Sequence, residues 1–134
     1  MRVQRIVTQP DPYERFRLAQ GYRAGDLLFI SGQAAYDAKG KIVGAGDFDA
    51  QAKQAFENLE RALRAGGSSL RNVIKVTIFL TDMSNFNKIV ELRERYFSPP
   101  YPADTIVEVC SLYSRDAMIE IEAVALADDA VERG

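Results

Sequence analysis

The feature that most constrains the fold is a change of hydrophobic period at Asp47. From there, apolar residues recur at helical spacing and charged residues occupy the opposite face, which predicts an amphipathic helix. Asp47 or Asp49 can cap its start, and the pair Gly66-Gly67 supplies a stop in the left-handed conformation. The β-branched run that follows predicts a strand with one apolar face, made of Ile74, Val76, Ile78 and Leu80.

Shorter patterns flank this helix and strand. Residues 27–31 predict a buried strand, and the Gly- and Asp-rich stretch 37–46 predicts a hairpin or loop. A second helix is expected to start near the capping residue Ser84 and to end by Ser98, because the prolines that follow cannot extend it. Two further strands are predicted at residues 105–110 and 117–127.

This order of elements predicts a single α+β domain over residues 1–134, a mixed sheet with two helices packed on one face. The opposite face would present Thr77, Phe79 and Met118, and such a face needs a partner. A symmetric homo-oligomer is the simplest solution.

Composition excludes several classes of function. The 134 residues have a net charge of −2 and scattered basic residues, so we expect no nucleic-acid partner. No apolar stretch is long enough for a membrane span, and the lack of a signal peptide and the single Cys110 favour a cytoplasmic protein. The absence of histidine removes Ser-His-Asp and Cys-His systems and argues against a catalytic metal.

Five segments stand out by their order and spacing: Gly25–Gln33, Gln51–Leu59, Val73–Asp82, Pro102-Ala103 leading to Val107–Val109, and Ile119–Ala123. Together they resemble the Rid (YjgF) family, whose best-known members are enamine/imine deaminases. The resemblance covers roughly residues 18–127. It implies a chorismate-mutase-like fold and a homotrimer with a small-molecule cleft at each subunit interface. It also implies hydrolysis of 2-imino acids or their enamine tautomers to 2-oxo acids and ammonia, with no metal or organic cofactor.

In this family an arginine grips the substrate carboxylate, a glutamate near the last strand positions or activates water, and a Ser-Gly segment shapes the pocket. The resemblance places the catalytic glutamate at Glu120 and the pocket segment at Ser31, Gly32 and Gln33. The arginine should follow Pro102-Ala103, where this chain has Asp104.

The loss of that arginine matters, because each charge-assisted hydrogen bond to a carboxylate contributes ~1.5–3 kcal/mol. A simple 2-imino acid should therefore be a poor substrate unless another arginine reaches the cleft; the candidates are Arg17, Arg93 and Arg115. The family also has an aromatic pocket residue upstream of the Ser-Gly segment, and the alignment places Leu18 at that position. Tyr22 or Tyr13 could take its place only if the alignment of this segment were shifted.

Asp104 has two further interpretations. It could lie close to Glu120, so that one of the two carboxyls stays protonated as a general acid, or the pair could attract a cationic ligand. Equally, Asp104 is an ordinary residue for the start of a strand, and Glu120 an ordinary one for a solvated strand face.

Three functions follow from these observations. The first is an imine or enamine hydrolase with an altered substrate class. The second is a trimeric ligand-binding or regulatory module without catalysis. The third, ribonuclease activity, has an older association with the family, but the scattered basic residues and the absence of histidine weigh against it.

Overall fold

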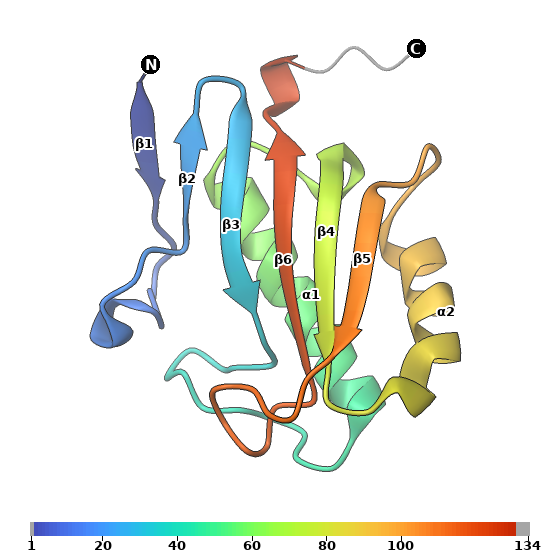
Figure 1. Cartoon of the computed structure of the whole chain (residues 1–134). Helices are drawn as coiled ribbons and strands as arrows, with labels where there is room; N and C mark the ends of the chain where they lie inside the picture. Colours follow the sequence, from blue (N-terminus) through green and yellow to red (C-terminus); the bar gives the residue numbers. More distant parts are fainter. Residues whose placement is uncertain (1, 131–134) are drawn as a thin grey trace.

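The computed structural model describes residues 2–130 and forms one six-stranded mixed sheet. The strand order is β1-β2-β3-β6-β4-β5, and only β4 and β5 run parallel to each other (Figure 1). The predicted α+β architecture is confirmed. The elements are β1 (Val3–Ile6), β2 (Gly21–Ala24), β3 (Leu27–Gln33), α1 (Phe48–Ala65), β4 (Val73–Leu80), α2 (Phe86–Tyr96), β5 (Ala103–Glu108) and β6 (Ile119–Leu126).

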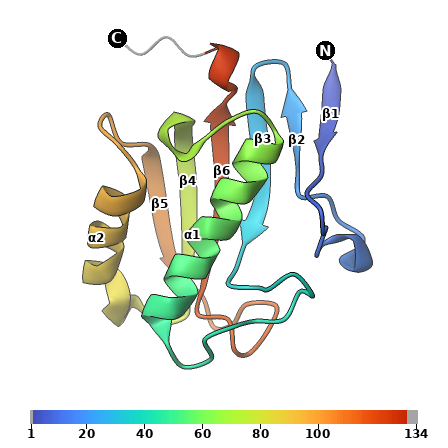
Figure 2. The ribbon, with the colours of Figure 1, turned by 180° about the vertical axis from the view of Figure 1, so that it is seen from behind.

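Both helices lie on the same side of the sheet, as the pattern predicts (Figure 2). Helix α1 is capped by Asp47, whose side chain accepts a hydrogen bond from the Ala50 amide, and it ends at Gly66. Its apolar face packs on β3 and β6. The fully buried side chains between helix and sheet include Phe56, Leu59, Leu63, Leu28, Ile78, Leu80, Ile119 and Ile121. Within residues 2–130, no helix is both long enough and apolar enough to cross a membrane.

The second helix departs from its predicted start. Asp82, not Ser84, is the capping residue: its carboxylate accepts a hydrogen bond from the Ser84 amide at 2.9 Å and opens a 3₁₀ turn over Met83–Asn85. Helix α2 follows this turn directly. Asp82, two residues before Ser84 and in extended conformation, is therefore the N-cap of this turn, and the backbone amide of Ser84 is the group that it caps.

Strand β4 departs from strict alternation at its first residues. Ile74 was predicted to share the buried face with Val76, but 39% of its surface is exposed. The register between β4 and β6 shifts between Val73 and Lys75, so that Val73 is buried and Ile74 is turned outward. A bulge of this kind reverses the side-chain alternation and is invisible to a period-two pattern.

The face of the sheet away from the helices exposes aromatic side chains. Phe29 on β3 and its cross-strand partner Tyr22 on β2 are 47% and 44% exposed. Thr77 and Phe79 lie half-buried on the same face, as predicted, whereas Met118 packs against the main core. This open face is where the sequence predicts a partner.

Candidate functional site

Glu120 lies at the start of β6 on the open face, opposite Phe79 of β4. Its side chain is half-buried, and it takes part in no hydrogen bond or ion pair between residues 2 and 130. The carboxyl lies directly against Gly32, where an added Cβ would be 2.5 Å from Oε2. Gly32 falls in the irregular part of β3, where pairing with β6 shifts between Ile30 and Gln33. A side chain at position 32 would therefore displace the Glu120 carboxyl from this place.

A cavity of about 250 Å³ opens above this carboxyl. It brings together the loop before β2, the end of β3, the hairpin that follows it and the loop before β6. Most of the wall is aromatic or apolar, and among residues 2–130 Glu120 is the one charged residue that lines it. The lining residues are Pro12, Tyr13, Phe16, Leu18, Ser31, Gly32, Tyr36, Gly40, Tyr113 and Glu120.

Tyr13 supplies the aromatic group that the sequence seemed to have lost at Leu18. Its hydroxyl donates a hydrogen bond to the Gly32 carbonyl, and its ring meets that of Tyr36 edge-on, with centroids 5.1 Å apart. Leu18 lines the same cavity, so both residues are present. Sequence alignment missed Tyr13 because it stands further from Ser31 along the chain than Leu18 does.

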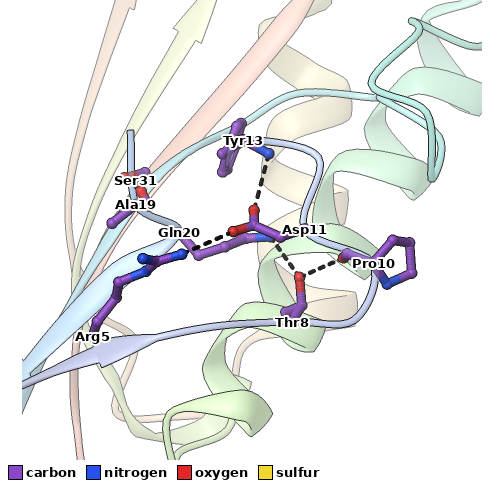
Figure 3. A network of polar contacts seen from close by, with 8 residues as sticks. All are labelled: Arg5, Thr8, Pro10, Asp11, Tyr13, Ala19, Gln20 and Ser31. Carbon is purple, nitrogen blue, oxygen red and sulfur yellow. Dashed lines mark hydrogen bonds and ion pairs between the residues drawn. The ribbon is translucent and has the colours of Figure 1, made fainter. Parts of the chain in front are cut away.

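A network of polar contacts fixes the loop that carries Tyr13 (Figure 3). Asp11 accepts a hydrogen bond from the Tyr13 amide at 3.0 Å and is 3.5 Å from Arg5. The buried Gln20 side chain donates to Thr8 at 2.7 Å, and Thr8 donates to the Pro10 carbonyl at 2.9 Å. The loop is therefore anchored to β1 and to the start of β2.

Burial governs the electrostatics of the cavity. It raises the pKa of the Glu120 carboxyl above its usual range, and the negative charge of Glu122 raises it further. Burial likewise raises the pKa of Tyr36 to about 12 and that of Tyr13 well above its ordinary value. Both phenols therefore keep their protons at neutral pH and act as hydrogen-bond donors, while Glu120 is poised to exchange a proton.

Ser31 and Gln33, both predicted to bind substrate, occupy different environments. Ser31 lines the cavity, and its hydroxyl donates to the Ala19 carbonyl at 2.6 Å (Figure 3). Gln33 is fully buried away from it. Its amide donates to the Ser31 carbonyl at 2.9 Å and accepts from the Tyr36 hydroxyl. Gln33 therefore holds the wall in place from behind and does not line the cavity.

Asp104 lies on the other side of the sheet. Its neighbour on β4 is the buried Val76, so the aspartate projects toward the helices, whereas Glu120 lies opposite Phe79 on the open face. Within one chain the two carboxyls do not form the proposed pair, and that prediction is wrong for a single chain. Residues that face each other on neighbouring strands project to the same side of the sheet. The strand register therefore suffices to place the Asp104 and Glu120 side chains on opposite sides.

Arg93 of α2 takes up the charge of Asp104. Its Nε donates to Oδ2 at 2.8 Å and its Nη2 donates to Oδ1 at 3.1 Å, a two-pronged ion pair with side chains 26% and 16% exposed. The pair borders a second cavity of about 590 Å³, which also includes Val90, Glu94, Phe97, Tyr101 and Pro102. Arg93, predicted as a replacement for the missing arginine, is therefore engaged with the residue that replaced it.

The remaining predicted residues do not line the Glu120 cavity in a single chain. Arg17 and Tyr22 border a separate hollow beside Arg5, and Arg115 is exposed on the loop before β6. Among residues 2–130, no three His, Cys, Asp or Glu side chains gather as they would around a metal ion. Sequence reasoning also missed Phe16 and Tyr113, which come from loops without a recognisable motif.

Comparison with known proteins places these observations in a family. Residues 8–127 match the family model described as Endoribonuclease L-PSP. A RutC family protein of Pyrococcus horikoshii is 42% identical over 120 residues, which are 90% of this chain and 94% of the relative. The human 2-iminobutanoate/2-iminopropanoate deaminase is 38% identical over 100 residues, 74% of this chain and 72% of the relative.

Solved structures give the same result. A member of the conserved Rid protein family from Yersinia pestis superposes with a TM-score of 0.86 at 27% identity, covering 94% of this chain and 100% of the other. The RidA structure from an Antarctic Psychrobacter superposes with a TM-score of 0.74 at 35% identity, covering 81% and 87%. The strand that bears Glu120, β6, lies within the residues 8–127 that match the family model.

Proposed function

Because this chain belongs to the Rid/YjgF family, which includes imine deaminases, we propose that it hydrolyses the C=N bond of a small imine or enamine in the Glu120 cavity. The observation that supports this most is the state of Glu120. Its half-buried carboxyl has no partner among residues 2–130, it has a raised pKa, and it faces a cavity of suitable size for a small metabolite.

The chemistry needs one group that both takes up and returns a proton. Ionised Glu120 removes a proton from a water molecule as that water attacks the carbon of the protonated imine, which gives a carbinolamine. Glu120 then returns the proton to the nitrogen. As the C–N bond breaks, the hydroxyl proton of the carbinolamine passes to the Glu120 carboxylate, so that a neutral carbonyl compound and ammonia leave, and loss of this proton to solvent restores ionised Glu120. An enamine first takes a proton at carbon to become the imine. A carboxyl whose pKa is raised toward neutrality serves both steps.

The substrate class is proposed to differ from that of relatives with an arginine at position 104. That position is acidic here, its charge is balanced by Arg93, and it faces away from Glu120 within the chain. The cavity presents one carboxyl and several aromatic rings, which favour the positively charged iminium form of a substrate. A carboxylate next to the C=N bond meets no arginine among the described residues that form the wall of this cavity.

We further propose that the chain works as a homotrimer joined through the open face. The exposed Phe29 and Tyr22 on that face, beside half-buried Thr77 and Phe79, support an association that covers them. In such an assembly the rim of each cavity would lie close to a neighbouring subunit. Light scattering at several concentrations should give three times the 14.9 kDa of the chain.

Ammonia release from freshly generated imines tests the proposed activity. The panel should pair 2-imino acids with imines that lack a carboxylate next to the C=N bond, and it should compare the wild type with Glu120→Gln. We expect turnover that depends on Glu120 and that does not favour simple 2-imino acids. Ligand binding without turnover on any member would instead identify a binding or regulatory module.

A further inference from the structure

Arg15 stands at the mouth of the Glu120 cavity. Its guanidinium carbon lies 4.8 Å from the centroid of the Phe16 ring, and its side chain passes 3.7 Å from the point where a Cβ on Gly40 would be. Phe16 and Gly40 both line the cavity. The cation is thus held at the rim by an aromatic face on one side and by the hairpin backbone on the other.

The charge of Arg15 is uncommitted. The ion pairs between residues 2 and 130 do not include it, and no hydrogen bond from its side chain is formed there. Asp37, the acidic residue of the adjacent hairpin, uses its carboxylate to accept the amide hydrogens of Lys39 and Lys41 at 2.9 and 3.0 Å. Arg15 is therefore available to an anionic group that enters the mouth.

Tyr113 links the mouth to the base of the cavity. Its ring packs edge-on against Phe16, with centroids 6.1 Å apart. Burial raises the pKa of its hydroxyl, the charge of Glu120 raises it further, and the charge of Arg15 opposes both. Tyr113 lines the same cavity as Glu120 and contacts Phe16, the residue over which Arg15 lies.

The surroundings of Arg15 attract anions. A shallow hollow beside the cavity holds four cationic side chains and two carboxylates, one of which, Asp11, already contacts Arg5. A positive rim of this kind raises the local concentration of an anionic ligand and guides it inward. The charged residues of the hollow are Arg15, Arg17, Lys39, Lys41, Asp11 and Glu14.

We propose that Arg15 recognises an anionic group on the substrate, and that the substrate is an imine or enamine bearing a carboxylate distal to its C=N bond. This proposal rests on the proposed function for the reacting end, at Glu120, and adds the recognition of the other end. The guanidinium would come from the loop before β2 in place of the strand position occupied by Asp104. The carboxylate is then several bonds away from the reacting carbon.

Binding of a matched pair of probes tests this recognition without requiring turnover. 2-Oxoglutarate presents a distal carboxylate, and the compound in which that carboxylate is a primary amide keeps the shape but not the charge. Calorimetry should compare the wild type with Arg15→Ala, Arg15→Lys and the control Lys39→Ala. Arg15 and Lys39 are cations of the same hollow, but Arg15 is the one that lies over the ring of the cavity-lining Phe16.

We expect Arg15→Ala to weaken 2-oxoglutarate binding about tenfold or more, with partial recovery in Arg15→Lys, because a charge-assisted contact is lost. The amide probe should be unaffected, and Lys39→Ala should change either affinity less than twofold. Equal binding of 2-oxoglutarate to the wild type and Arg15→Ala would overturn the proposal. An equal loss for both probes would also overturn it, since Arg15 would then act only by packing.

The two proposals fail separately. If imine turnover requires Glu120 but is unchanged in Arg15→Ala with every substrate, the proposed hydrolysis is supported and the proposed recognition of a distal carboxylate is wrong. A selective loss of 2-oxoglutarate binding in Arg15→Ala, with no turnover by the wild type, would leave the anion site standing and remove the hydrolysis.

Discussion

Two carboxyls on opposite faces of one sheet differ in every respect that decides their chemistry. Asp104, on the helix side, receives two hydrogen bonds from Arg93, while Glu120, on the open side, has no partner among residues 2–130 and lies on the bare backbone of Gly32. Burial raises the pKa of Glu120. A carboxylate fixed by a guanidinium stabilises structure, whereas a partly buried one without a partner is available for proton transfer.

The difference also explains how this chain accommodates an acidic residue at the position where the family resemblance implies an arginine. An aspartate beside a cavity would repel an anionic ligand if its charge were free. The bidentate contact with Arg93 neutralises that charge and occupies two donors of the guanidinium. Position 104 has therefore become part of a link between α2 and β5, and the features suited to catalysis lie in the other cavity.

The largest expected effect tests which carboxyl is chemically active. Glu120→Gln should lower turnover of the best imine substrate by about a hundredfold or more, because general acid–base groups contribute about 10²–10⁴ to the rate. The control is Asp104→Asn, which keeps the shape and one acceptor and should retain most of the activity. Similar losses in both variants would remove the distinction between the two carboxyls.

Gly32→Ala sharpens the comparison by displacing Glu120 without changing its charge. The new Cβ would lie 2.5 Å from Oε2, so the carboxyl must move, and we expect kcat to fall about ten- to a hundredfold. The matched control is Gly21→Ala, whose Cβ meets the Phe29 carbonyl at 2.4 Å and should lower the melting temperature instead. Unchanged kcat in Gly32→Ala would show that the position of Glu120 is not critical.

Asp104→Ala probes the opposite face through stability. It leaves Arg93 partly buried without its partner and should cost about 2 kcal/mol in the free energy of unfolding, less than for a fully buried pair. Removal of Glu60, which pairs with Arg64 on the exposed surface of α1, should cost about 0.5 kcal/mol or less. Equal small losses in urea unfolding would mean that the Arg93 pair is merely a surface contact.

The smallest expected effect is the pH dependence of stability. Folded Glu120 keeps its proton to a higher pH than the unfolded chain does, since burial raises its pKa. The unfolded state therefore loses its proton first as pH rises, and wild-type stability falls between the ordinary glutamate pKa of about 4.3 and the raised folded value. Glu120→Gln should be more stable than the wild type at neutral pH, with the difference shrinking on acidification. A variant that is less stable at neutral pH would contradict this sign.

The sequence predicts the parts of this fold that repeat with a regular period. Helix α1 and strands β3, β4 and β6 follow from apolar spacing that local burial enforces, and the proline run after α2 predicts where that helix ends. The bulge that turns Ile74 outward, the short edge strand β1 and its neighbour β2 are set by pairing with other strands. Phe86, the first residue of α2, is 40% exposed, and the Arg93 guanidinium lies over its ring.

The candidate site was predictable only where a motif marks it. Glu120, Ser31 and Gly32 could be named from the family resemblance, and they do meet in one cavity. Tyr13 could be named only as an alternative that needs a shifted alignment, and Phe16 and Arg15 could not be named, because a loop held by long-range hydrogen bonds brings these residues there. The sequence alone does not exclude that Asp104 lies beside Glu120. The strand register excludes it within one chain, because Asp104 is paired with Val76 of β4 and Glu120 with Phe79, and these two β4 residues project to opposite sides of the sheet.

Direct titration of the Glu120 side chain tests the central distinction best. Carbon NMR of its carboxyl resonance in the labelled wild type, assigned by its disappearance in the Glu120→Gln variant, reports the protonation of that one group. A midpoint above the ordinary glutamate range is predicted, since the carboxyl is partly buried and has no cation beside it. A midpoint at or below that range would show that it is solvated or paired, and the assignment of proton transfer to this residue would have to be abandoned.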